Sequence, residues 1–139
     1  MALSDASAVE SPMKNGALTK TILVVEDNEL NMKLFNDLLS AHGYKVLRAS
    51  DGSAGLQLTR QHHPDLIVMD VQLPGGLSGL DVTRSLKEDD DLKTIPVIAV
   101  TAFAMKGDDK KILDAGCDAY MPKPISALRF LESIKGFLN

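Results

Sequence analysis

Five short apolar runs alternate along the chain with longer segments in which apolar residues recur every three or four positions. The runs are rich in β-branched residues and bounded by turn residues, which predicts buried strands. They cover residues 21–25, 44–49, 66–69, 95–100 and 118–121. The longer segments predict helices that begin near residues 30, 51, 80, 106 and 126.

The first and last helical segments carry the clearest apolar stripes. In the first, the repeating positions are Leu30, Leu34, Leu38 and Ala41, with Phe35 beside them. In the last, they are Leu128, Leu131, Ile134 and Leu138. Residues at this spacing share one face of an α-helix, so we expect both stripes to pack against a sheet. Gly43 and Gly116 are positioned to end the first and fourth helices.

Regular alternation of strands and helices predicts an α/β protein with a parallel sheet and helices on both faces. Right-handed crossovers then favour a (βα)5 doubly wound sheet with the strand order 2-1-3-4-5, as in flavodoxin-like folds. In that order the carboxyl ends of the first and third strands meet beside the switch point. Ligand sites of such sheets lie there.

Residues 1–19 show no periodicity and are rich in Ser, Ala and Gly, so we expect a disordered tail followed by one domain over 20–139. A chain of 139 residues with 45% hydrophobic and 24% charged residues suits one globular domain. A net charge of −4 argues mildly against broad nucleic-acid binding. Its single cysteine, Cys117, excludes an internal disulfide. No membrane span or signal peptide is apparent, so we expect a cytoplasmic protein.

Polar side chains follow four of the five predicted strands. Glu26 and Asp27 follow the first, Asp70 the third, Thr101 the fourth and Lys123 the fifth. Each has an ordinary alternative explanation as a helix cap, a strand end or a solvated charge. Four strands ending in this way are improbable by chance, and the carboxyl ends of parallel strands meet at one edge. The pattern therefore predicts a functional site.

Three carboxylates at one edge favour a bound cation. At ~4–5 Å and an effective dielectric near 20, like charges repel by several kcal/mol. Mg²⁺ prefers a few carboxylates, water and phosphate oxygens, and the backbone carbonyl of Gln72 could add a ligand. Asp70 could then attack phosphorus as a nucleophile. Lys123 could neutralise the transferring group, and Thr101 could hydrogen-bond the phosphoryl product.

Four segments carry a family resemblance. They are Val24-Val25-Glu26-Asp27-Asn28, Met69-Asp70-Val71-Gln72-Leu73-Pro74, Val100-Thr101-Ala102 and Lys123-Pro124. Together they resemble response-regulator receiver domains over about residues 20–139. Residues 26–35 and 100–108 are similar, more narrowly, to single-domain regulators of bacterial cell division and polarity. The resemblance implies a two-component phosphoprotein whose phosphoryl donor is a histidine kinase or kinase-phosphatase.

The same resemblance implies a role for each site residue. Asp70 would be the phosphoacceptor, with Glu26 and Asp27 as the further carboxylates on the metal side. Thr101 and Lys123 would contact the phosphoryl group. The expected cofactor is Mg²⁺. The protein would be a signalling module that assists its own phosphorylation and dephosphorylation, not an enzyme.

A conformational switch is also implied. Tyr120 matches the family's switch aromatic and would move together with Thr101. Phe103 and Met105 lie in the loop that the family uses for switching, although core packing explains them equally well. The family often has a cis peptide where this chain has Lys123-Pro124. Because the chain ends soon after its last helix, we expect output through protein contacts, by a monomer or weak dimer.

One feature departs from the family pattern. Gly79 follows Asp70 by nine residues, whereas the family usually has eight. Gly75 and Gly76 supply the additional residue and add freedom to the loop. This puts the loop conformation and access of the donor in question, but not Asp70 itself.

Three other function classes compete with this interpretation. A metal-dependent phosphohydrolase with Asp70 as nucleophile would carry an acid two residues later, where this chain has Gln72. A flavodoxin-like cofactor binder would need a phosphate-cradling loop where Glu26 and Asp27 lie. A pseudo-receiver that acts without phosphorylation is disfavoured by the full set of site residues. Neither nucleic acid nor membrane insertion is expected.

Overall fold

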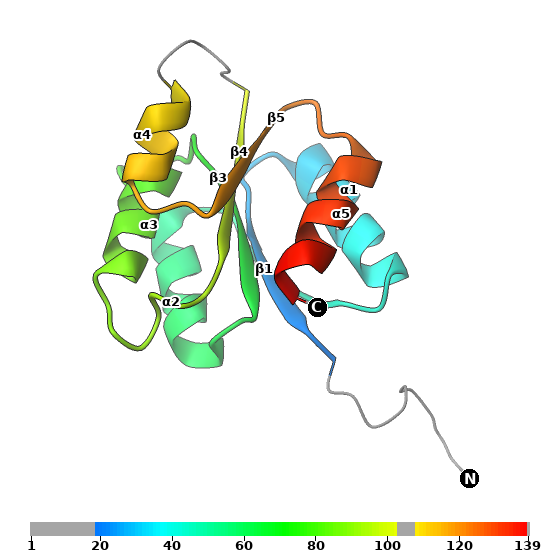
Figure 1. Cartoon of the computed structure of the whole chain (residues 1–139), viewed down its shortest axis with the longest axis horizontal. Coiled ribbons are helices and arrows are strands. Elements are labelled where there is room, and N and C mark those ends of the chain that lie inside the picture. Colours follow the sequence, from blue (N-terminus) through cyan, green and yellow to red (C-terminus); the bar gives the residue numbers. More distant parts are fainter. Residues whose placement is uncertain (1–18, 103–107, 139) are drawn as a thin grey trace, which may run out of the picture.

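The computed structural model describes residues 19–102 and 108–138 (Figure 1). Within these ranges five parallel strands in the order β2-β1-β3-β4-β5 alternate with five helices, which confirms the predicted fold. The elements are β1 Thr21–Val25, α1 Glu29–Ala41, β2 Lys45–Ala49, α2 Gly52–His62, β3 Leu66–Asp70, α3 Gly79–Lys87, β4 Val97–Thr101, α4 Asp108–Asp114, β5 Ala119–Pro122 and α5 Ala127–Leu138. Most of the predicted tail, and the loop residues Phe103 and Met105, lie outside the described ranges.

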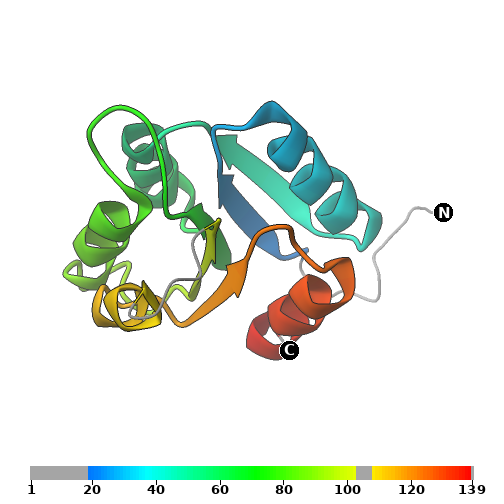
Figure 2. The same ribbon diagram turned by 90° about the horizontal axis from the view of Figure 1, so that it is seen from above.

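The sheet separates two helical layers. Figures 1 and 2 show α1 and α5 on one face and α2, α3 and α4 on the other. Side chains alternate between the faces along each strand, so Ile22 and Val24 join one core cluster while Leu23 and Val25 join the other. All residues of β3 and β4 are buried, as expected for central strands of a parallel sheet covered on both faces.

The stripe predicted for α1 is rotated from the face that packs on the sheet. Phe35 and Leu39 are fully buried, whereas Leu30 and Leu34 are 80% and 48% exposed. The prediction that these two leucines face the core was therefore wrong. Phe35 meets Phe130 of α5 with the ring centroids 5.2 Å apart, and this aromatic contact sets which face of α1 turns inward.

The stripe predicted for α5 needs a similar correction. Leu128 is 71% exposed, and Phe130 and Ile134 are the buried residues of this helix. Ile134 was predicted correctly, while Phe130 takes the place that had been assigned to Leu128. No helix within the described ranges is long and apolar enough to cross a membrane.

Candidate functional site

Asp70 is the last residue of the central strand β3, at the carboxyl edge of the sheet. It is 5% exposed, because β1 and β4 flank it and helices cover both faces of the sheet. The backbone N–H of Gln72 donates to Asp70 Oδ1 at 3.1 Å. A short strand of apolar residues thus places one carboxylate at the edge, with one backbone donor to orient it.

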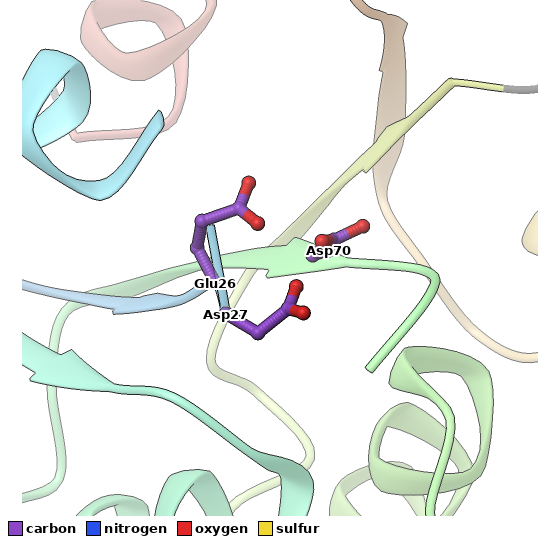
Figure 3. Close-up of side chains that lie close together, drawn as sticks. All are labelled: Glu26, Asp27 and Asp70. Carbon is purple, nitrogen blue, oxygen red and sulfur yellow. The ribbon is translucent and has the colours of Figure 1, made fainter. Parts of the chain in front are cut away.

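Glu26 and Asp27 follow β1 on the neighbouring strand. Glu26 is 2% exposed, and its backbone N–H donates to the carbonyl of Ala49 at 2.9 Å. Asn28 then caps α1 by accepting from the backbone N–H of Asn31, so the chain turns immediately after the two acids. Figure 3 shows the three carboxyl groups gathered at the ends of β1 and β3. One oxygen from each group lies within 4.8 Å of the other two.

Lys123 brings a positive charge to the same edge. Its backbone N–H donates to the carbonyl of Thr101 at 2.7 Å, which holds the exit of β5 against the end of β4. Its Nζ lies 2.9 Å from Glu26 Oε1 and 3.2 Å from Asp70 Oδ2. The Lys123-Pro124 peptide is cis, as the resemblance implied. The ion pair between Lys123 and Glu26 was not predicted from the sequence.

Close packing of these charges changes their pKa values. Burial raises the pKa of Asp70 to about 7, and its hydrogen bond with Glu26 acts in the same direction. Burial opposes ionisation of Glu26, but Asp70 and Lys123 together hold the pKa of Glu26 below its ordinary value. Burial also disfavours the charged form of Lys123, yet its carboxylate partners raise its pKa. Without a cation, Asp70 therefore loses its proton only as the pH rises through about 7, in a site shared with Glu26.

The donor set fits a hard divalent cation. Lys123 Nζ is near Glu26 Oε1 but outside hydrogen-bond geometry, so this oxygen is the one buried side-chain oxygen or nitrogen without a hydrogen bond in the described part of the chain. Asp27 is exposed and can present its carboxylate beside the buried pair. A buried oxygen without a hydrogen-bond donor, next to two further carboxylates, matches the oxygen ligands that Mg²⁺ takes. Glu26, Asp27, Asp70 and the Gln72 carbonyl as metal ligands stay predictions.

The predicted switch residues lie next to the site. Thr101 is the last residue of β4 and is buried, with 3% exposure. Tyr120 of β5 lies opposite Ala99, two residues before Thr101, and so it is on the same face of the sheet as Thr101. Tyr120 is 42% exposed and lines a surface groove together with Pro122, Pro124, Ser126 and Arg129. The geometry brings these residues together, while their movement stays a prediction.

The additional residue between Asp70 and Gly79 is accommodated in an exposed turn. Gly75 and Gly76 have φ angles of 88° and 91°, in the left-handed region that favours glycine. A Cβ at either position would meet nothing within 4 Å. The departure from the usual spacing therefore changes the outline of the loop away from Asp70.

Comparisons with known proteins agree on one family. The pattern of the "Response regulator receiver domain" family matches residues 22–135. The polar-differentiation response regulator DivK of Brucella ovis is 60% identical over 122 residues, or 88% of this chain and 98% of the relative, and that of Brucella anthropi is 59% identical. Among solved structures, the chain is similar to the receiver domain of a Pseudomonas aeruginosa PAO1 sensor histidine kinase, which has magnesium in its active-site cleft. The two are 30% identical and superpose with a TM-score of 0.80. The match covers 87% of this chain and 98% of that one.

Proposed function

The chain belongs to the response regulator receiver family, and from this premise we propose that it is a signalling protein switched by phosphorylation of Asp70. The observation that carries the proposal is the arrangement of one nearly buried carboxylate, Asp70, between an ammonium and two further acids. The donor would be a phosphohistidine of a histidine kinase. A carboxylate oxygen of Asp70 forms the new P–O bond, the P–N bond breaks, and the histidine nitrogen leaves with the electron pair.

Glu26, Asp27 and Asp70, with the Gln72 carbonyl, would hold Mg²⁺. When bound, Mg²⁺ supplies positive charge that offsets the carboxylates and the phosphoryl oxygens. Lys123 lies 3.2 Å from Asp70 Oδ2 and can follow the negative charge onto a phosphoryl oxygen. The same ammonium also contacts Glu26, so phosphorylation would redistribute an existing ion pair instead of ordering a free side chain.

Transmission to a partner would run through Thr101 and Tyr120. The Thr101 hydroxyl would donate to the phosphoryl group, and its movement would change the space available to Tyr120 on the same face of the sheet. Tyr120 and the groove beside it, about 490 Å³ in volume, form an exposed surface for a downstream protein. Phosphorylation would thus bias a two-state surface, without any direct contact between Asp70 and the partner.

The signalling role is supported by chemistry and by similarity. Gln72 stands two residues after Asp70, and its amide cannot act as a general acid, which fits a phosphoryl group that persists instead of rapid turnover. The protein would act in the cytoplasm, in control of polarity or cell division. The name of the Brucella relatives, which mentions polar differentiation, supports the role in polarity.

Phosphoryl labelling tests the proposal. The parent protein, incubated with acetyl phosphate and Mg²⁺, should gain one base-labile phosphoryl group measured by intact mass. Asp70→Asn should gain none, while Asp37→Asn, a change to an exposed aspartate of α1, should label as the parent does. Undiminished labelling of Asp70→Asn would refute the assignment.

A further inference from the structure

The first residue of α3, Gly79, lies against the backbone of Asp70. A Cβ at this position would be 2.0 Å from the carbonyl oxygen of Asp70, 2.9 Å from its carbonyl carbon and 3.0 Å from Met69 Cγ. Real Cβ atoms essentially never approach other atoms closer than 3.0 Å. The φ angle of Gly79 is outside the positive region, so space alone, and not backbone conformation, requires glycine here.

One hydrogen bond ties the start of α3 to the chain after Asp70, and others within the helix fix where it begins. The backbone N–H of Gly79 donates to the carbonyl of Val71 at 3.0 Å. Ser78 and Asp81 form a reciprocal capping box that begins the helix at this point. The Thr83 hydroxyl donates to the carbonyl of Gly79 at 2.8 Å. The start of α3 therefore cannot move away from Asp70 without breaking the hydrogen bond between Gly79 and Val71.

We propose that Gly79 is a positioning residue for the phosphoacceptor, a role that rests on the function proposed above. Contact with the first turn of α3 determines where the peptide after Asp70 lies. The Gln72 N–H that orients Asp70 Oδ1 belongs to the same short segment. Any side chain at position 79 would displace the Asp70 backbone and this N–H together, and so move the carboxylate relative to Lys123 and Glu26.

The contact also explains why the longer loop is tolerated. Because Gly79 is held on Asp70, the additional residue must be absorbed between them, and Gly75 and Gly76 absorb it in solvent. The position of Asp70 therefore does not depend on the length of the loop. The loop can vary in length while the reacting carboxylate stays in register with the other strand ends.

The matched test compares Gly79→Ala with Gly52→Ala. Gly52 is also a buried first residue of a helix, but the three atoms nearest to its Cβ would belong to Val82 and Leu77, with Val82 Cγ2 at 2.8 Å and Leu77 Cβ at 2.9 Å. Both variants should lose stability in urea. At saturating Mg²⁺, with the folded fraction matched, only Gly79→Ala should be phosphorylated by acetyl phosphate on the order of 10²-fold more slowly, as expected for a reacting group misplaced by ~1 Å.

Mg²⁺ affinity, measured by calorimetry, gives a second readout that does not depend on phosphoryl transfer. It should fall in Gly79→Ala and stay near the parent value in Gly52→Ala. Equal losses of rate and affinity in the two variants, or a parent-like Gly79→Ala, would overturn the proposal. A parent protein that binds Mg²⁺ but takes no phosphoryl group would instead contradict the proposed function.

Deletion of Gly76 keeps the proposal testable if Gly79→Ala does not fold. The deletion shortens only the exposed turn, so it should leave both the phosphorylation rate and the Mg²⁺ affinity close to those of the parent. A loss of rate in the deletion variant comparable to 10²-fold would show that the loop, and not the Gly79 contact, places Asp70.

Discussion

Replacing Asp70 by Asn should stabilise the metal-free protein at neutral and alkaline pH. Asp70 is nearly buried and hydrogen-bonded with Glu26, and burial raises its pKa from 3.8 to about 7. The unfolded chain releases this proton near the ordinary pKa, so between about pH 4 and 7 the folded state binds more protons than the unfolded state. The free energy of unfolding must then fall as the pH rises through this range.

The size of the effect follows from the pKa difference. One pKa unit corresponds to about 1.4 kcal/mol. A rise from 3.8 to about 7 therefore means that ionisation of Asp70 in the folded protein lowers the free energy of unfolding by at most about 4 kcal/mol. The gain in Asp70→Asn is smaller than this value, because Glu26, whose pKa is lowered, contributes stability of the opposite sign. The attraction of Lys123 is already part of the pKa of about 7 and is not subtracted again. We expect a net gain of roughly 2–3 kcal/mol at pH 8 and almost none near pH 4.

Urea unfolding in the presence of EDTA measures this gain, with the midpoint and slope fitted at each pH. Asp37→Asn is the control, because Asp37 is exposed on α1 and forms its ion pair with Lys33 of the same helix. It should show no gain that grows between pH 4 and pH 8. If Asp70→Asn is no more stable than the parent at pH 8, or gains equally at both pH values, ionisation of buried Asp70 does not destabilise the metal-free protein and the reasoning is refuted.

Three further outcomes follow from the same contacts. Mg²⁺ at a hundredfold excess over its Kd should stabilise the parent by about 2.7 kcal/mol in thermal unfolding. Asp27→Asn should weaken this stabilisation and raise the melting temperature of the metal-free protein. A parent melting temperature that Mg²⁺ does not change would contradict the site. Lys123→Met should lose about 1–3 kcal/mol of unfolding free energy without metal, but should still fold and bind Mg²⁺. Its affinity for the partner should be the same before and after phosphorylation. A gain of partner affinity equal to that of the parent would show that Lys123 has no role in switching. Phe130→Ala should lower the free energy of unfolding in urea by about 3–5 kcal/mol, because its contact with Phe35 is lost. A loss below about 1 kcal/mol would contradict the packing of α1 on α5.

Much of this protein could be predicted from the sequence because the ends of strands are local properties and the alternation of strands and helices restricts the strand order. An apolar run such as Leu66–Met69 marks a central strand wherever it packs, and the residue that follows it must lie at the carboxyl edge of a parallel sheet. Glu26, Asp70 and Lys123 could therefore be assigned to one site before any distance was known.

Tertiary structure decided what depends on contacts between distant segments. Helical spacing indicates an apolar stripe but not which part of it faces inward, and the packing of Phe35 on Phe130 left Leu30 and Leu34 in solvent. The ion pair between Lys123 and Glu26 depends on how the end of β5 lies across the end of β1.

Gly79 shows the same division. Its spacing from Asp70 is visible in the sequence, but a glycine there has no special φ angle and forms no motif of its own. Only the packing of the start of α3 on the carbonyl of Asp70 makes a Cβ impossible at that position. Two atoms from different elements cannot occupy the same volume, and which atoms meet is decided only when the elements pack together.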